Sequence, residues 1–344
     1  MKKGNKFGVH RVIEPEGVLP QPADRIDNTM EIYDNEILID VHTLNIDSAS
    51  FTQIEEEAGG DVEKIKARMK EIVEKRGKHH NPVTGSGGML IGEIKEIGPA
   101  LKDRDLEVGD RIATLVSLSL TPLRIDKIKE VKKDIDQVHI DGKAVLFESG
   151  IYAKLPEDME DTLALAVLDV AGAAAQTAKL VKPGDNVLVI GAGGKSGLLC
   201  LHEAKKRAGV TGKVLGMGHS DSSTNRIKEL GLADEVLQGD ATKPVEVLDM
   251  VKQATDGELV DVVINNVNIP NTEMGSILPC KDGGLVYFFS MATSFTKAAL
   301  GAEGVGKDVE MIVGNGYTRG HAAISLEILR ENEKLREIFT NLYT

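Results

Sequence analysis

The sequence predicts an α/β protein in two parts, a β-rich N-terminal unit and a doubly wound parallel sheet. The length of 344 residues corresponds to two domains at about 150 residues each. Glycine is abundant, at 36 residues, and the Val/Ile/Leu runs are short, a pattern typical of buried strands with tight turns. From about residue 158 these runs alternate with helix-length segments, which is the signature of a parallel sheet.

The N-terminal part contains short apolar runs separated by turn residues. The runs at residues 36–41, 88–94 and 110–116 predict strands. The charged segment 52–75 differs, because its apolar residues follow helical spacing. We therefore expect one amphipathic helix inserted in the β-rich unit. Its apolar residues are Ile65, Met69, Ile72 and Val73.

The second part alternates predicted strands with predicted helices. A Gly-rich turn and a helix through Lys206 follow the first strand, and the segment Thr224–Leu230 follows the second as a helix. The tail from Ala322 to Leu342 is predicted to be helical. The predicted strands are residues 187–190, 214–217, 262–264 and 285–289.

Charge and cysteine usage exclude several classes of function. With 41 basic and 54 acidic residues, the formal charge of −13 disfavours nucleic acid and anionic membranes as partners. No apolar run has the length of a membrane span, and the N-terminus lacks a secretory signal. Cys200 and Cys280 form no CxxC pair, so zinc-finger and thioredoxin-like sites are excluded. Free thiols fit a reducing cytoplasm, where we expect the protein to work.

The strongest motif is the glycine-rich turn, residues 191–197, which follows a predicted strand and opens a predicted helix. This context is typical of dinucleotide binding, in which the helix N-terminus holds a pyrophosphate. A helix-packing turn without a ligand is the alternative. A P-loop is excluded because Val189 occupies the position of its first glycine. The residues expected to contact the cofactor are Gly191, Gly193, Gly194, Lys195, Ser196 and Gly197, with Ser196 at the usual place of the third glycine and Gly197 one residue late.

The end of the second strand favours NAD over NADP. An acid that binds the adenosine ribose is expected about 20 residues after the last glycine of the turn. Gly218 stands at the usual position, and Ser220 and Asp221 follow slightly late. No Arg or Lys lies in residues 214–225 to neutralise a 2′-phosphate, although His219 would favour NADP.

Several motifs resemble the medium-chain dehydrogenases/reductases. They are residues 85–94, Ile97-Gly98, residues 108–112, residues 176–178 and residues 181–187, and the resemblance covers nearly the whole chain. It implies a GroES-like domain over residues 1–155, a Rossmann domain over residues 156–320, and a C-terminal helix, 321–344, that packs back on the N-terminal domain.

The resemblance also implies a zinc-free member. Asn45, Ser86 and Ala173 stand at the positions of the catalytic zinc ligands in the zinc alcohol dehydrogenases, and none is a usual zinc ligand. The inserted helix, residues 79–89 and the glycine-rich turn resemble the family of L-erythro-3,5-diaminohexanoate dehydrogenases. This resemblance implies NAD-dependent oxidative deamination of a small diamino acid in lysine fermentation. A neutral amine can expel hydride without a metal.

Four residues are candidates for acid–base chemistry. Asp47 stands where relatives carry a proton-relay hydroxyl, and its alternative role is to cap a turn. Asp169 lies in the apolar run 163–175, where burial suits acid–base work, unless it only bonds neighbouring backbone. His79 and His80 precede the Ser86 strand and titrate near working pH, although adjacent loop histidines are usually solvated.

Three further residues are expected near the cofactor. The resemblance places Thr177 near the nicotinamide. Asn265 and Asn266 end the third clear strand of the second part, where strand ends line a ligand crevice, and a turn is the alternative.

Two other functions remain open. One is a zinc-free NADPH-dependent quinone or enoyl reductase, against which the acids Asp47 and Asp169 argue, since an apolar enone needs no carboxylate. The other is a non-catalytic, crystallin-like binding protein, against which the intact glycine-rich turn argues. We expect a homodimer or homotetramer.

Overall fold

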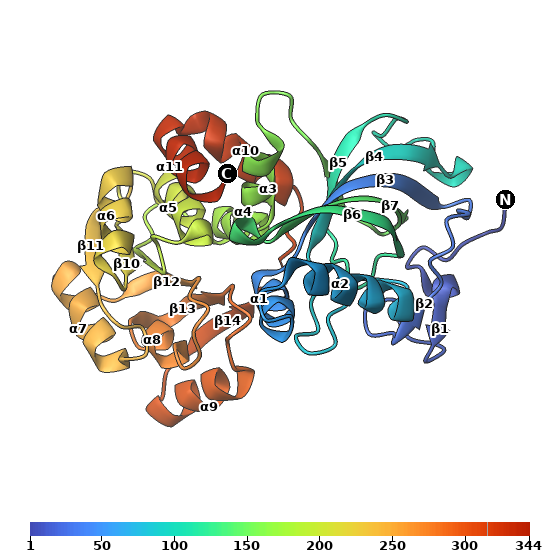
Figure 1. The fold of residues 1–344 in the computed structure, drawn as a ribbon. Coiled ribbons are helices and arrows are strands. Elements are labelled where there is room, and N and C mark those ends of the chain that lie inside the picture. The colour runs from blue at the N-terminus through green and yellow to red at the C-terminus, as the bar shows by residue number, and fades with distance from the viewer. Residues whose placement is uncertain (315) are drawn as a thin grey trace. The chain divides into compact units, whose positions relative to one another are not determined.

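The computed structural model describes residues 1–314 and 316–344 and contains two compact units, Met1–Leu165 and Ala166–Thr344 (Figure 1). Helix α3 (Asp161–Leu168) crosses the boundary between them. The boundary expected from the sequence lies earlier, at residue 155. The domain limits taken from the resemblance therefore stay a prediction.

The first unit is built on an antiparallel sheet of six strands in the order β6-β7-β3-β4-β5-β8, with the two-stranded sheet β1-β2 beside it. The predicted strands at residues 36–41, 88–94 and 110–116 correspond to β3, β4 and β5. The strands are β1 (Val12–Glu14), β2 (Arg25–Ile26), β3 (Glu36–Asn45), β4 (Met89–Ile97), β5 (Arg111–Thr114), β6 (Leu123–Lys132), β7 (Gln137–Phe147) and β8 (Tyr152–Lys154).

The insertion between β3 and β4 is two helices, α1 (Ser48–Glu57) and α2 (Val62–Arg76), so the expectation of one helix over 52–75 is wrong. Gly59 and Gly60 both have positive φ and end the first helix, and Asp61 caps the second through the amide N–H groups of residues 63 and 64. The expected apolar face is correct: Ile65, Met69, Ile72 and Val73 are buried in one core with the sheet.

A buried ion pair anchors the start of β3. Glu36 and Arg11 are almost completely buried, and Arg11 donates to both carboxylate oxygens of Glu36, at 2.6 and 2.7 Å. Burial alone would raise the pKa of Glu36. Hydrogen bonds from Arg11, from His10 and from the Tyr33 amide outweigh burial and hold the pKa at about 2. The carboxylate therefore stays charged and ties the N-terminal segment to the sheet.

The second unit contains a six-stranded parallel sheet in the order β11-β10-β9-β12-β13-β14. This is the order of the Rossmann fold, with its topological switch point between β9 and β12. The elements are α4 (Ala171–Leu180), β9 (Val187–Ile190), α5 (Lys195–Ala208), β10 (Val214–Gly218), α6 (Asp221–Leu230), β11 (Glu235–Gln238), α7 (Pro244–Ala254), β12 (Val260–Asn265), α8 (Glu273–Ile277), β13 (Cys280–Phe288), α9 (Phe295–Val305), β14 (Val309–Val313), α10 (His321–Glu331) and α11 (Glu333–Tyr343).

The sequence predicted the inner strands of this sheet and missed both edges, β11 and β14. The inner strands β9 and β10 are buried throughout, so they form continuous apolar runs. Edge strands are half exposed and carry polar residues, as the Glu-Val-Leu-Gln of β11 shows. Short mixed segments of that kind do not stand out by hydrophobic period.

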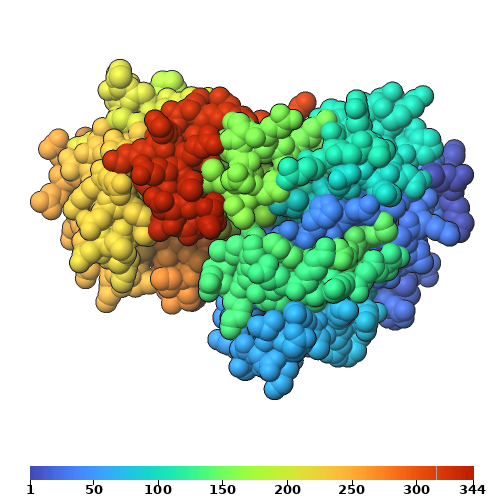
Figure 2. Space-filling model, turned by 45° about the horizontal axis from the view of Figure 1, so that its top comes forward, coloured from blue at the N-terminus to red at the C-terminus, as the bar shows by residue number. Residues whose placement is uncertain are grey.

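Helices α10 and α11 form the C-terminal tail and cover part of the surface of the second unit, in red in Figure 2. Lys206 of α5 pairs with Glu331 at the end of α10, which joins the tail to its own unit. The expected packing of the tail on the N-terminal domain stays a prediction. The two cysteines, Cys200 and Cys280, are buried as free thiols inside this unit.

Across the described residues, no single helix is long and apolar enough to cross a membrane. The bent pair α3 and α4 has the length and composition for a crossing only when its two helices are taken together.

We predict that Glu36→Gln destabilises the protein by about 3–5 kcal/mol, because it leaves the buried Arg11 guanidinium without its carboxylate. Urea unfolding at pH 7 measures this loss. Glu56→Gln, on the exposed face of α1, is the control and should change the free energy of unfolding by less than about 0.5 kcal/mol. Equal stability of the two variants would contradict the prediction.

Candidate active site

The glycine-rich turn, Gly191–Gly197, connects β9 to α5, and its geometry depends on missing β-carbons. Gly191 has φ +75°, which only glycine adopts readily. A β-carbon on Gly193 would overlap the backbone of Ser223, and one on Gly197 would overlap the carbonyl oxygen of Gly191. Gly197 therefore allows the close helix–strand packing usually supplied by the third glycine, although it comes one residue late.

The N-terminus of α5 carries the remaining residues of the turn. Gly194 is the N-cap and Lys195 is the first helical residue. The Lys195 ammonium pairs with the Asp169 carboxylate at 3.1 Å and lies 5.2 Å from the centre of the Tyr343 ring. Ser196 is buried beneath the turn.

Asp169 is not the buried acid that its apolar surroundings predicted. Helix α3 ends just before Asp169 and helix α4 begins two residues after it, and the residue is exposed in this break between the helices. Its partner is Lys195 of the glycine-rich turn, which the sequence did not suggest. Asp169 is therefore positioned beside the N-terminus of α5.

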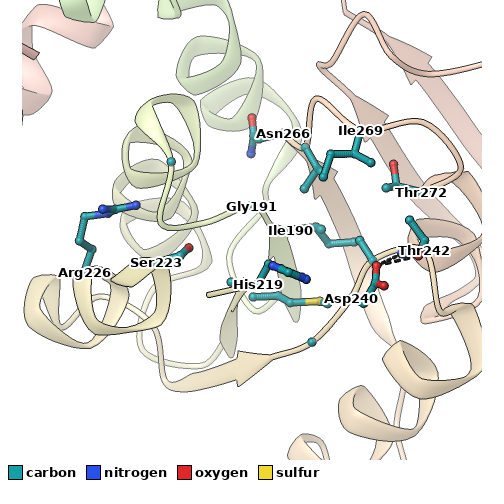
Figure 3. Close-up of a pocket in the computed structure, with 16 residues that line it drawn as sticks. Ile190, Gly191, His219, Ser223, Arg226, Asp240, Thr242, Asn266, Ile269 and Thr272 are labelled. Atoms are coloured by element: carbon teal, nitrogen blue, oxygen red, sulfur yellow. Dashed lines mark hydrogen bonds between the residues drawn. The ribbon is translucent and has the colours of Figure 1, made fainter. Parts of the chain in front are cut away.

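A cavity of about 250 Å³ opens at the topological switch point, and we call it the switch-point cavity (Figure 3). Ile190 and Gly191 line it from the end of β9, His219 from the end of β10, and Asn266 from the end of β12. Ligands of open α/β sheets bind at this place, outside the carboxyl ends of the strands.

Some predicted cofactor residues line the switch-point cavity and others have structural partners. Gly191, Gly194 and Asn266 line it. The Nδ2 atom of Asn266 is buried and has no hydrogen-bond partner among the described residues. Asn265 instead holds its own loop, because its amide donates to Thr272 and Ser276 at 2.9 Å. Thr177 is buried in α4, where its hydroxyl donates to Ala173 O.

The two predicted cofactor residues after β10, Ser220 and Asp221, have hydrogen-bond partners within the protein, and their contact with the cofactor stays a prediction. Ser220 caps α6 by accepting from the Ser223 amide, and Asp221 accepts from Gln238 Nε2 at 2.9 Å. His219 lines the cavity here. Arg226 is the first basic residue after residues 214–225, which contain no Arg or Lys, and it also lines the cavity. Its Nε donates to Gly193 O at 2.8 Å, which ties α6 to the turn.

The cavity residues that follow β11 were not predicted from the sequence. Asp240 and Thr242 line the switch-point cavity, and Thr242 donates to Asp240 from its amide and its hydroxyl. Residues after a parallel strand line the ligand crevice, so a predicted strand at β11 would have indicated Asp240 and Thr242. They were not indicated because β11 itself was not predicted.

Polar residues of the first unit come from two segments, residues 47–50 at the start of α1 and residues 84–87. The Asp47 carboxylate is half-buried and accepts from the Gly87 amide at 3.0 Å. Nearby, the buried Ser50 hydroxyl lies 2.5 Å from Thr84 Oγ1 and 2.6 Å from Ser86 Oγ. Two segments far apart in sequence, 47–50 and 84–87, thus bring a carboxylate and three hydroxyls together.

The two histidines are neutral near pH 7, which differs from the expectation that they titrate there. His79 is fully buried, and desolvation lowers its pKa to about 4. Burial, with the nearby Lys78 and Arg76 charges, lowers the pKa of His80 to about 4 as well. Both ring nitrogens of His79 lack a hydrogen-bond partner among the described residues.

The residues at the expected zinc positions engage in other contacts. Asn45 Oδ1 accepts from Gln137 Nε2 at 3.4 Å, Ser86 belongs to the hydroxyl cluster, and Ala173 is buried in α4. Among the described residues, one other group has suitable ligand atoms, formed by His202, Glu203 and Glu331. Its two glutamates are already paired with Arg207 and Lys206.

Two independent observations indicate that the second unit fits a dinucleotide. The glycine-rich turn leaves space that β-carbons would fill, and Asn266, which lines the switch-point cavity, has a buried amide nitrogen without a partner among the described residues. The N-terminus of α5 adds unpaired N–H groups and a positive dipole end beside the turn.

Comparisons with known proteins point in one direction. Residues 10–156 match the L-erythro-3,5-diaminohexanoate dehydrogenase N-terminal domain family. L-erythro-3,5-diaminohexanoate dehydrogenase of Acetoanaerobium sticklandii is 65% identical over 342 residues, covering 99% of each chain. The enzyme of the same name from Fusobacterium nucleatum subsp. nucleatum is 65% identical over all of both chains. A solved alcohol dehydrogenase from Thermotoga maritima is 16% identical, with a TM-score of 0.54, over 90% of this chain and 85% of that one.

The structural likeness shows a shared fold, the medium-chain dehydrogenase/reductase fold that the sequence motifs predicted. Dehydrogenase relatives together with a Rossmann sheet imply a nicotinamide cofactor.

We predict that Gly197→Ala weakens NADH binding at least tenfold, because the new methyl group must push α5 away from the turn. NADH fluorescence titration measures the dissociation constant. Gly304→Ala, in α9 with open space around its Cα, is the matched control and should bind like the wild type. Unchanged binding by Gly197→Ala would refute the role given to this glycine.

We predict that the free energy of unfolding falls by about 2 kcal/mol through His79 alone between pH 7.5 and pH 5. The sign follows from its lowered pKa: the unfolded chain protonates below about 6.5, whereas the folded chain resists protonation down to about 4. Urea unfolding of the wild type and His79→Gln at both pH values measures it. On acidification, His79→Gln should lose less stability than the wild type. The control His42→Gln, at an exposed histidine, should lose as much stability as the wild type. Parallel losses in all three proteins would contradict it.

Proposed function

Since the chain belongs to the family of L-erythro-3,5-diaminohexanoate dehydrogenases, we propose that it catalyses the NAD-dependent oxidative deamination of L-erythro-3,5-diaminohexanoate to 5-amino-3-oxohexanoate. The chain is a dehydrogenase. The observation that supports this substrate is the 65% identity to two enzymes with this name along their full length. The reaction belongs to lysine fermentation.

The overall reaction takes the substrate ammonium, NAD and water to the ketone, ammonium ion, NADH and one proton. Hydride leaves the carbon that bears the reacting amine, and water then replaces the imine nitrogen. An ammonium group has no lone pair with which to expel hydride. The protein must therefore supply a base that removes a proton from the substrate ammonium, and it must pair the second ammonium with an anion.

NAD is the proposed cofactor, and its nicotinamide accepts the hydride when bound. The glycine-rich turn and the N-terminus of α5 would hold the pyrophosphate, and the Asn266 amide would donate to the dinucleotide in the switch-point cavity. NAD is favoured over NADP because Arg226 already donates to Gly193 O, and residues 214–225 contain no Arg or Lys that would pair with a second phosphate.

Asp47 is the proposed base. Its carboxylate is half-buried, which suits a group that must exchange protons while bound to a substrate. The Gly87 amide holds one of its oxygens, which orients the carboxylate, and the linked hydroxyls of Ser50, Thr84 and Ser86 come from the same two segments and are the proposed proton acceptors after it. Hydroxyls at this place, in contrast to imidazoles and thiolates, suit an ammonium substrate better than zinc.

The other proposed acid–base residues have narrower roles. Asp169 is held by Lys195, so its proposed role is to position the start of α5 and to offer a carboxylate to a substrate ammonium. His79 and His80 are neutral at pH 7, so in this proposal each acts as a hydrogen-bonding group during imine hydrolysis rather than as a cationic acid.

The remaining expectations are proposals of the same kind. We propose that the protein works in the cytoplasm as a homodimer or homotetramer, which light scattering on a sizing column measures directly. No observation favours the quinone or enoyl reductase, or the non-catalytic binding protein.

We predict NADH formation with the diamino acid and a loss of at least about 100-fold in kcat/KM for Asp47→Asn, because general-base catalysis contributes about 10²–10⁴. The wild-type rate should rise with pH as the substrate amine loses its proton. Steady-state absorbance of NADH measures both.

Asp47→Asn should still bind NADH like the wild type, which separates lost chemistry from lost folding. Asp169→Asn should cost less than Asp47→Asn, because its role is positional. Wild-type turnover of a quinone with NADPH, and none of the diamino acid with NAD, would refute the proposed function. Full activity in Asp47→Asn would refute only the choice of base.

We predict that the activity is independent of zinc, since Asn45, Ser86 and Ala173 occupy the positions of the usual ligands. Prolonged dialysis against a chelator should leave the initial rate unchanged. A loss of activity that zinc restores would show that the reaction uses the metal.

A further inference from the structure

The Asp240 carboxylate lines the switch-point cavity, and one of its two oxygens accepts no hydrogen bond from the described residues. Both hydrogen bonds from Thr242, at 2.9 Å from the amide and 2.7 Å from the hydroxyl, end on Oδ1. No donor of the described residues reaches Oδ2. Asp240 is the only carboxylate among the residues that line the cavity.

The cavity has two chemically different ends (Figure 3). Arg226 and Ser223 lie at the end where Arg226 donates to Gly193 of the glycine-rich turn. Asp240 and Thr242 lie at the other end, near Thr272. The phosphates of a dinucleotide belong at the first end, because the turn and the helix N-terminus attract anions.

The end that contains Asp240 suits a flat base. Ile190, Met217, Val267 and Ile269 contribute apolar surface to the cavity, which suits the faces of a purine. The loop that carries Asp240 is fixed against α8, since a β-carbon on Gly275 would overlap the carbonyl oxygen of Ala241. The carboxylate is therefore held at a defined place on the cavity wall.

We propose that Asp240 is a specificity-determining residue that recognises the adenine base by accepting a hydrogen bond from its exocyclic amine. A carboxylate accepts hydrogen bonds and cannot donate them while ionised. Adenine presents an amine at this edge, whereas hypoxanthine and guanine present a carbonyl oxygen, which a carboxylate would repel. The inference rests on the proposed dinucleotide cofactor and adds the group that selects its base.

The environment of Asp240 keeps it an acceptor. The Thr242 hydroxyl and amide lower the pKa of the carboxyl group below its ordinary value, so it stays ionised at neutral pH. His219 at the end of β10 and Lys243 on its own loop also favour the ionised form of Asp240. Thr242 fixes Oδ1 and leaves Oδ2 for the ligand.

Direct binding tests this assignment without relying on turnover. Dissociation constants are measured by fluorescence for NADH, for the reduced dinucleotide that carries hypoxanthine in place of adenine, and for NADPH. The wild type should bind NADH at least about tenfold tighter than the hypoxanthine analogue, as one charge-assisted hydrogen bond allows. Asp240→Asn should reduce this ratio to about one or invert it, because an amide can donate to the carbonyl oxygen.

The controls separate the possible outcomes. Asp249→Asn, on the exposed surface of α7, should keep the wild-type ratio. Asp240→Ala, which can neither accept nor donate, should lose the preference without inverting it. An unchanged ratio in Asp240→Asn would overturn the inference and leave the cofactor assignment intact. A selective gain in NADPH affinity would also overturn it, since Asp240 would then face the ribose. If the wild type binds none of the three dinucleotides, the cofactor assignment fails as well.

Discussion

The second unit depends on backbone atoms approaching one another where side chains would not fit. The glycine-rich turn brings α5 against the end of β9, and Gly193 brings the turn against α6 at Ser223. These contacts set the distance between the N-terminus of α5 and the carboxyl ends of β9, β10 and β12. The shape of the switch-point cavity follows from that distance, and so does the exposure of the N–H groups that attract phosphate.

Local sequence patterns predicted the parts of the fold in which neighbours in sequence are neighbours in space. The inner strands, the turn and the apolar face of α2 follow from hydrophobic period and glycine position. The edge strands β11 and β14 carry too little apolar surface to show such a pattern. The split between α1 and α2 was also visible in Gly59-Gly60-Asp61, whose breaking effect the longer amphipathic pattern concealed.

The candidate site was harder to predict because its contacts join distant segments. The pairing of Asp169 with Lys195 depends on where two helices end, and the exposure of Asp169 could not be deduced from its apolar neighbours in sequence. Asp240 and Arg226 belong to no recognisable sequence motif. Only the structure shows that both line the same cavity. The resemblance to known families, by contrast, supplied the substrate class, which no spacing of residues in this chain encodes.

The buried cysteines have a practical consequence for handling this protein. Burial raises the pKa of both Cys200 and Cys280 to about 12, so almost no thiolate exists at neutral pH. Because the thiolate is the species that alkylating agents and oxidants attack, the native protein should resist both. The two thiols become reactive only when the second unit opens. The rate at which a thiol reagent labels them therefore measures the rate of opening of the Rossmann unit, without an engineered probe.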